Sequence, residues 1–175
     1  VLVVVAFLGS LGLPSICTVE TNYYCIRIQD SVNKDGMKRQ TLFLDHLVHT
    51  VVTPARADEC GYEYEQIQAG LVAARYSPED VFSTLTIGGG GYSMPRYLER
   101  FYPQSTVDVV EIDPGVTEAN HRLLGLSRES RIHTVNMDAR LFLAHLPPEK
   151  TYEMIFGDAV NDFAVPYQIT TREFY

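Results

Sequence analysis

The segment Leu85-Thr86-Ile87-Gly88-Gly89-Gly90-Gly91-Tyr92-Ser93 leads from a β-branched run into four successive glycines. Apolar side chains then recur at helical spacing, at Met94, Tyr97, Leu98 and Phe101. This order predicts a strand over 81–87, a tight turn and a helix over 93–101. Glycines in such a turn permit positive φ angles and let a ligand lie against bare main chain.

A second strand is predicted over 106–112, and it carries Glu111 20 residues beyond Gly91 (111 − 91). Nucleotide-binding βαβ units place an acidic side chain at about this distance, where it accepts hydrogen bonds from ribose hydroxyls. The two strands and the glycine turn therefore predict a nucleoside site. A βα connection that binds nothing is the alternative, and the spacing of Glu111 makes it less favoured.

The length and composition fit one α/β domain with a small appendage. The chain has 175 residues, of which 46% are hydrophobic, enough for a sizeable core. Its 14 Lys and Arg against 22 Asp and Glu give a net charge of −8, which disfavours a nucleic-acid partner and permits a cationic substrate. The three cysteines, Cys17, Cys25 and Cys60, are odd in number and lie in no CxxC spacing. We therefore expect free thiols in a reducing compartment and a cytoplasmic protein.

The apolar start of the chain has two interpretations. The run Val1–Leu8 is shorter than the roughly 20 apolar residues of a membrane-spanning helix, and it lacks the features of a secretory signal. Because residue 1 is a valine, we expect the chain to be cut from a longer one. The run is then a buried strand or helix end, or the end of a transmembrane helix that tethers the domain. The predicted divisions are an apolar lead-in at 1–19, a β appendage at 20–60 and a nucleoside-binding domain at 61–175.

The appendage is predicted from two extended runs, 21–30 and 37–44, with Asp35-Gly36 between them. Asp-Gly between extended runs is a strong hairpin signal, and 48–53 adds a third strand. A helical pattern over 64–74 follows and ends before Pro78.

From Val81 onward strands and helices alternate, which predicts a mostly parallel sheet with helices on both faces. After the segments already given, the predicted order is helix 115–124, strand 131–135, helix 139–146 and strand 152–157. Residues 163–175 read as a loop and the first turn of another helix, with Thr171 as its cap. A sheet of this kind would normally continue, so we expect a truncated sheet whose open edge a partner chain covers, as in a homo-oligomer.

Carboxylates follow three of the predicted strands, at Glu111, Asp138 and Asp158. Ligands collect at the carboxyl ends of parallel strands, so these side chains are expected in one crevice. Asp138 precedes a helical pattern, and a helix cap and a ligand contact are equally supported there and compatible. Asp158 ends an apolar strand, where a carboxylate needs a partner or a ligand. A metal pair of Glu111 and Asp158 is the weaker interpretation, because no histidine lies at matching spacing, and no metal is predicted.

The motifs at these strand ends resemble those of the spermidine synthases, the polyamine aminopropyltransferases. They are Ile87–Gly90, Val110–Pro114, Asp138–Arg140 and Tyr152–Asp158. The appendage agrees through Thr21–Tyr23, Leu42–Asp45 and Asp58-Glu59. The resemblance covers about residues 20–175 and is closest to the branch in which the domain follows a membrane-embedded region. It implies a Rossmann-like α/β fold of the S-adenosylmethionine-dependent methyltransferase type, with a parallel sheet and a small N-terminal antiparallel β appendage.

The resemblance implies a nucleoside half of the site. Gly88, Gly89 and Gly90 would lie behind the nucleoside and its sulfonium-bearing chain. Glu111 would hold the ribose hydroxyls. Asp138 and Ala139 would contact the adenine.

The resemblance also implies an amine half. Asp158 would take the place of the catalytic carboxylate, and Tyr62 or Tyr64 would line the amine channel. An alkylamine with a pKa near 10 is mostly protonated at neutral pH, so a carboxylate that orients it and accepts its proton is the expected helper.

Several positions depart from the family pattern. Gly91 stands where the family has an aspartate that faces the donor's ammonium, and Asn161 replaces a second aspartate. Asp162 is the candidate substitute for that second carboxylate. His46 and His49 replace a glycine and a glutamine of the appendage.

The chain is therefore predicted to move an aminopropyl group from decarboxylated S-adenosylmethionine to a polyamine such as putrescine, with release of methylthioadenosine. An S-adenosylmethionine-dependent methyltransferase is one alternative. A non-catalytic nucleoside-binding domain of a membrane protein is the second, suggested by the changes in the amine half.

Overall fold

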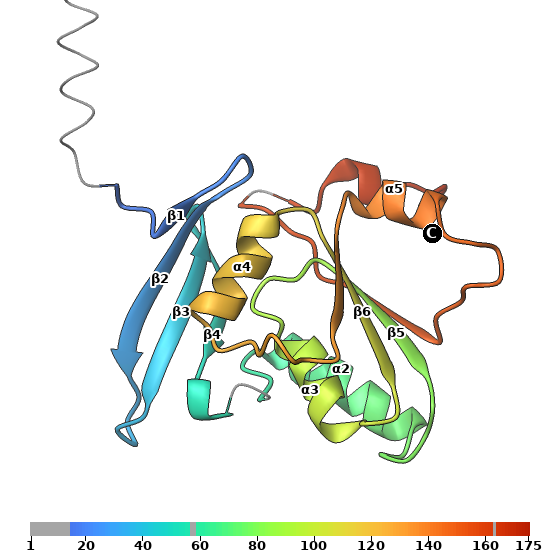
Figure 1. The fold of residues 1–175 in the computed structure, drawn as a ribbon, viewed down its shortest axis with the longest axis horizontal. Coiled ribbons are helices and arrows are strands. Elements are labelled where there is room, and N and C mark those ends of the chain that lie inside the picture. Colours follow the sequence, from blue (N-terminus) through green and yellow to red (C-terminus); the bar gives the residue numbers. More distant parts are fainter. Residues whose placement is uncertain (1–14, 57–58, 163) are drawn as a thin grey trace, which may run out of the picture.

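The structure, a computed structural model, describes residues 15–56, 59–162 and 164–175, and within these ranges it contains two four-stranded sheets. The prediction for the apolar run Val1–Leu8 lies outside the described residues. Figure 1 shows the antiparallel sheet on one side, the parallel sheet on the other and the helix α4 between them. The described part has no helix that is both long and apolar enough to cross a membrane.

The first sheet is antiparallel in the order β1-β2-β3-β4. Its strands are β1 (Val19–Glu20), β2 (Cys25–Val32), β3 (Lys38–Leu44) and β4 (Leu47–Val52). The predicted hairpin is confirmed, and Gly36 supplies its turn with a φ of 78°. The third strand is also confirmed, whereas the two-residue strand β1 was not predicted. A short 3₁₀ turn, η1 (Pro54–Arg56), follows β4.

The prediction that all three cysteines are free thiols is wrong, because Cys17 and Cys25 form a disulfide. Antiparallel pairing of β1 with β2 places Glu20 opposite Cys25 and brings the preceding segment back along β2. The Cα atoms of the two cysteines consequently lie 5.2 Å apart. Since disulfides persist in oxidising compartments, the cysteine argument for a cytoplasmic protein loses its support. Cys60 is the one free cysteine among the described residues.

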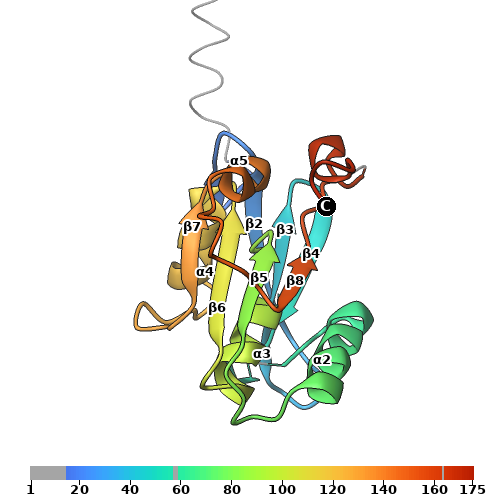
Figure 2. The ribbon, with the colours of Figure 1, turned by 90° about the vertical axis from the view of Figure 1, so that its right-hand side faces the viewer.

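The second sheet is wholly parallel in the order β7-β6-β5-β8 (Figure 2). Its strands are β5 (Ser83–Ile87), β6 (Thr106–Glu111), β7 (His133–Asn136) and β8 (Met154–Gly157). The helices are α2 (Glu63–Arg75), α3 (Ser93–Phe101), α4 (Pro114–Arg122) and α5 (Ala139–Ala144). The predicted alternation is confirmed, with several boundaries shifted by one or two residues. That a partner chain in a homo-oligomer covers an edge of this sheet stays a prediction.

The end of the chain differs from the prediction. The helix expected to begin at Thr171 is absent from the described residues, and a hydrogen-bonded turn runs from Thr171 to Phe174 in its place. A 3₁₀ turn, η2 (Tyr167–Ile169), precedes it.

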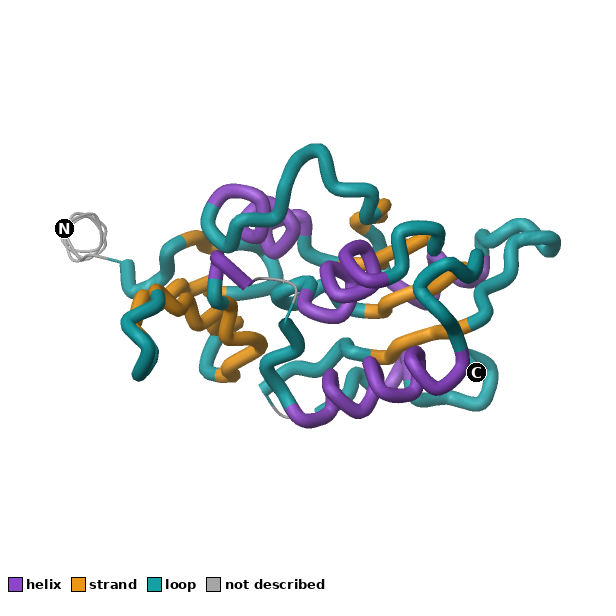
Figure 3. The backbone as a smooth tube through the Cα atoms, turned by 90° about the horizontal axis from the view of Figure 1, so that it is seen from below, coloured by secondary structure: helices purple, strands orange, loops and turns teal. Residues whose placement is uncertain are grey.

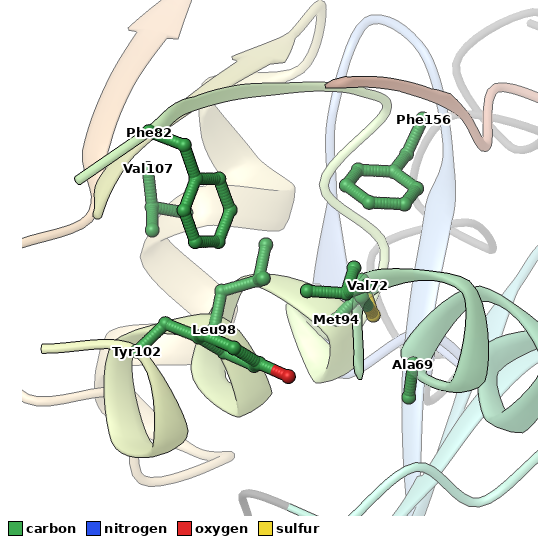
Figure 4. Packing of buried hydrophobic residues seen from close by; sticks show 8 residues of the cluster. All are labelled: Ala69, Val72, Phe82, Met94, Leu98, Tyr102, Val107 and Phe156. Carbon is green, nitrogen blue, oxygen red and sulfur yellow. The ribbon is translucent and has the colours of Figure 1, made fainter. Parts of the chain in front are cut away.

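Helices cover both faces of the parallel sheet, as Figure 3 shows from below. Alternate side chains of each strand point to opposite faces. On one face Val107 and Phe156 pack with Phe82 against α2 and α3 (Figure 4). On the other face Leu85 and Val110 pack against α5 and the segments after it.

The helix α4 and a polar contact at its start hold the sheets together. Val116 of α4 packs with Ile26 and Leu42 of the antiparallel sheet in one buried cluster. The Thr21 hydroxyl donates to Asp113 Oδ2 at 2.6 Å, at the start of the same helix. The antiparallel sheet is therefore placed against the ends of the parallel strands.

Candidate active site

The glycine turn lies where the strand order of the parallel sheet reverses. The chain goes from β5 outward to β6 and β7, then returns to place β8 on the other side of β5. Open α/β sheets bind ligands at such a reversal, at the carboxyl ends of the strands. Gly88 has a φ of 95°, and a Cβ there would lie 2.5 Å from the carbonyl oxygen of Asp158. Only glycine fits this crossing of the two strand ends.

A pocket of about 610 Å³ opens at these strand ends. This volume is within the range of roughly 300–1,000 Å³ that small-molecule sites occupy. Five of the six predicted nucleoside-contacting residues line it: Gly88, Gly90, Glu111, Asp138 and Ala139. Gly89 is outside the lining, and its N–H donates instead to Glu111 Oε2 at 2.6 Å.

Glu111 is buried and held by the backbone. Oε2 accepts from Gly89, and Oε1 accepts from the N–H of Asp113 at 2.8 Å. Burial raises the pKa of the carboxyl group, and the backbone hydrogen bonds partly offset this. Because each carboxylate oxygen has two lone pairs, the group keeps acceptor capacity for a ligand hydroxyl.

Asp138 caps a helix, as one of its two sequence interpretations predicted, and its contact with a ligand stays a prediction. Its Oδ1 accepts from the N–H of Leu141 at 3.0 Å and so caps α5. The residue also lines the pocket, with Met137 and Ala139 beside it.

Asp158 lies half-buried at the end of β8 and is bonded to Tyr64. The Tyr64 hydroxyl donates to Oδ1 at 3.1 Å and to Oδ2 at 3.2 Å. Desolvation raises the pKa of Asp158 to about 6, although the Tyr64 hydrogen bond lowers it, and the Glu65 carboxylate adds to the rise. The group is thus mostly ionised at neutral pH and has a basicity suited to accepting a proton.

A second, smaller pocket of about 310 Å³ adjoins the first at Asp158. Tyr62 and Tyr64 of the α2 region line it, and their rings stack with centroids 5.8 Å apart. Asp158 lines both pockets, as do His49 and Val160. One carboxylate therefore faces both pockets.

The antiparallel sheet explains why position 91 is glycine. A Cβ on Gly91 would lie 2.0 Å from Cγ2 of Thr50, which is buried on β4. The Thr50 hydroxyl is also 3.0 Å from the Ser93 hydroxyl, within hydrogen-bonding distance. The space that an aspartate would need is filled by the appendage.

Asp162 lies away from the lining of both pockets among the described residues. Its Oδ2 accepts from the N–H of His46 at 3.2 Å, and its Oδ1 accepts from the N–H of Leu47 at 3.1 Å. Desolvation alone would raise its pKa, but these bonds and the His46 ring hold the pKa below its usual value. Asp162 thus ties the loop after β8 to the β3–β4 turn, whereas Asn161 lines the larger pocket.

Four lining residues of the appendage had no predicted contact with a ligand: Tyr23, Tyr24, Leu44 and His49. Burial raises the pKa of Tyr24 to about 12, so its hydroxyl remains a donor. Desolvation lowers the pKa of His49, which keeps the imidazole neutral. The family motifs Thr21–Tyr23 and Leu42–Asp45, and the departure at His49, were the sequence signals for this wall. In the part of the chain that is described, no cluster of three or more His, Cys, Asp or Glu side chains could hold a metal.

Comparisons with known proteins agree with this geometry. A polyamine aminopropyltransferase of Vibrio vulnificus is 42% identical over 94 residues, which are 51% of this chain and 30% of that protein. A mouse eEF1A lysine and N-terminal methyltransferase is 30% identical over 105 residues, which are 57% of this chain and 15% of that protein. No family model matches the chain.

A crystal structure of a probable spermidine synthase from Corynebacterium glutamicum has the same fold. It aligns with a TM-score of 0.77 and 22% identity over 93% of this chain and 58% of the other. The chain thus spans less than two thirds of each of these proteins. The predicted α/β fold of the methyltransferase type is confirmed.

Proposed function

We propose a function from the premise that this chain is related, in sequence and in fold, to the spermidine synthase family. The chain is a transferase that moves an aminopropyl group from decarboxylated S-adenosylmethionine to an amine and releases methylthioadenosine. The observation that carries the proposal is the position of Asp158, in the wall of both pockets. Putrescine is the reference acceptor.

The larger pocket suits the nucleoside part of the donor. Glu111 accepts hydrogen bonds from the ribose hydroxyls, and Asp138 accepts from the adenine amino group, with Ala139 against the ring. The main chain at Gly88 and Gly90 leaves room for the sulfonium-bearing chain, because neither residue has a side chain on the pocket wall.

The smaller pocket suits the acceptor. The amine nitrogen attacks the methylene carbon next to the sulfonium, a C–N bond forms, and the C–S bond breaks with its electron pair going to sulfur. The leaving group is a neutral thioether and needs no acid. Asp158 accepts a proton from the amine and holds the nitrogen so that the nitrogen lone pair points at the donor carbon. Tyr64 holds the carboxylate in position through its two hydrogen bonds.

The substitution Asp158→Asn tests this role. We expect the rate of methylthioadenosine release to fall at least 100-fold, because the amide cannot accept the proton. Binding of methylthioadenosine, measured by calorimetry, should change less than threefold. Turnover that is unaffected by the substitution would remove Asp158 from the mechanism.

Methyl transfer from S-adenosylmethionine is the second candidate, supported by the 30% identity to the mouse methyltransferase. Gly91 and Thr50 leave no carboxylate for the donor ammonium at that point of the turn. Calorimetric titration with decarboxylated S-adenosylmethionine and with S-adenosylmethionine separates the two candidates. Binding of nucleosides without turnover of any amine would favour the non-catalytic alternative. Membrane attachment through the N-terminus remains a prediction.

A further inference from the structure

The charge distribution around the smaller pocket bears on which amine enters it. Asp158 is the one carboxylate in its lining among the residues that the structure describes. The remaining lining residues are apolar, aromatic or uncharged: Leu47, Val48, His49, Tyr62, Gly157 and Val160, together with Tyr64. Within the described residues, the pocket therefore offers an ionic partner to one amino group.

Two other carboxylates, Glu65 and Asp162, act electrostatically on residues of this lining and serve other contacts. Glu65 is buried on α2, and its Oε2 accepts from the N–H of Tyr62 at 3.0 Å. Asp162 is bonded to the β3–β4 turn. Neither residue lines the smaller pocket. A second ammonium inside this pocket would lose hydration without an ion pair, which is unfavourable.

The lining of the smaller pocket suits an acceptor amine with an apolar tail. Val48 of β4 and Val160 of the loop after β8 line the pocket together with the stacked rings of Tyr62 and Tyr64. Burial of alkyl or aromatic surface against these groups is favourable in proportion to its area.

We propose that the acceptor is a monoamine with an apolar tail, its amino group at Asp158 and its tail against Val48, Tyr62 and Tyr64. This inference rests on the proposed function and narrows its acceptor from amines in general to primary amines with a single charge.

The test compares n-butylamine, n-hexylamine and putrescine as acceptors for the full chain with decarboxylated S-adenosylmethionine. Methylthioadenosine release gives kcat/KM for each amine. We expect hexylamine to exceed butylamine, and butylamine to exceed putrescine by at least threefold. A preference for putrescine would mean that tyrosine ring faces serve as the partner of its second ammonium, and it would overturn the inference.

The substitution Val48→Asp supplies the missing carboxylate, and Val48→Asn is the matched neutral control. Val48 is 36% exposed, so either side chain can be accommodated without burying an unpaired charge. Val48→Asp should raise the ratio of putrescine to butylamine at least tenfold, whereas Val48→Asn should leave it within threefold. Equal effects of the two variants would contradict the role of charge.

A binding measurement separates this inference from the proposed function. Butylamine and putrescine are titrated calorimetrically into protein saturated with methylthioadenosine. Preferential binding of butylamine without turnover of any amine would end the proposed function and support the monoamine pocket. Turnover with a preference for putrescine would support the proposed function and overturn the monoamine pocket.

Discussion

Tyr64 controls the acidity of Asp158 through its two hydrogen bonds. Desolvation raises the pKa of this carboxyl group and the Tyr64 bonds lower it, and the net pKa is about 6. A proton-accepting carboxylate works only when ionised, so kcat/KM should rise with pH through this value.

Removing the hydroxyl should therefore shift the pH profile. In Tyr64→Phe the ring still excludes water, but the hydrogen bonds are lost, so the pKa of Asp158 rises further above 6. The acidic limb of the kcat/KM profile should move to higher pH by about half a unit or more. Tyr62→Phe is the control, because the Tyr62 hydroxyl donates to the carbonyl of Val48 and does not contact Asp158. An equal shift in both variants would contradict this reasoning.

The raised pKa of Asp158 should also make folding stability depend on pH. Stability should fall as the pH rises, whereas kcat/KM should rise. The folded-state pKa of Asp158 lies above its ordinary value of 3.8, so the folded chain binds more protons than the unfolded chain between about pH 4 and 6. The contribution of Asp158 to stability is present below this window and is lost as the pH rises through it. Comparison of urea unfolding of the native chain and Asp158→Asn across this range measures it. A difference that does not depend on pH would contradict the raised pKa.

Gly91 and Thr50 should behave as a coupled pair. Gly91→Ala should lower the free energy of unfolding by about 1–3 kcal/mol, because the added Cβ meets a buried side chain. Thr50→Ala would not relieve the clash, since the Cβ of Thr50 would itself lie 2.6 Å away. In Thr50→Gly the space opens, and the double variant should lose at least 1 kcal/mol less than the sum of the single losses.

The control for Gly91 is Gly70→Ala in the exposed face of α2. A Cβ there meets no atom within 4 Å, so helix propensity should make it neutral or stabilising. Additive losses in the Gly91 and Thr50 variants, measured by urea unfolding, would show that the two residues do not share this space.

Helices, strands and turns that have a local sequence pattern could be predicted. Features that depend on contacts between distant residues could not. Residues 93–101 follow helical spacing, and Asp35-Gly36 is a local turn signal, so both elements were predictable. The disulfide of Cys17 and Cys25 depends on a two-residue strand, β1, that has no pattern of its own. Likewise, the requirement for glycine at position 91 comes from Thr50, which is distant in sequence.

The disulfide should stabilise the antiparallel sheet. It closes a short loop, since the two cysteines are eight positions apart, and in the chain-entropy account this contributes about 2.5 kcal/mol. Reduction should lower the free energy of unfolding by this amount in urea titrations. The double variant Cys17→Ser with Cys25→Ser is the control and should not respond to reductant. Burial raises the pKa of the Cys60 thiol to about 12, so it should not exchange with the disulfide.

In the whole molecule, the site is a joint product of the two sheets. The parallel sheet supplies the carboxylates at its strand ends, and these were predictable because parallel strands end at a common edge. The antiparallel sheet supplies Tyr24 and His49, which line the larger pocket from the other side. No periodicity in the sequence reports how one sheet lies against the other, so this wall could not be derived from the residues alone.

The attachment of the two sheets can be tested at Asp162, whose carboxylate accepts from the main chain of His46 and Leu47. Asp162→Ala leaves these two N–H groups without this partner, and each such bond is worth about 1 kcal/mol. We expect a loss of about 1–2 kcal/mol in the free energy of unfolding. Methylthioadenosine affinity should also fall by about tenfold, because the wall that carries His49 is then less firmly held against the strand ends.

Asp35→Asn is the matched control, since it removes an exposed carboxylate from the β2–β3 hairpin and the resulting Asn-Gly pair keeps the turn. It should change neither quantity by more than experimental error. If Asp162→Ala weakened folding but left nucleoside affinity unchanged, the larger pocket would depend on the parallel sheet alone. The appendage would then act on the acceptor side, where His49 also lines the smaller pocket.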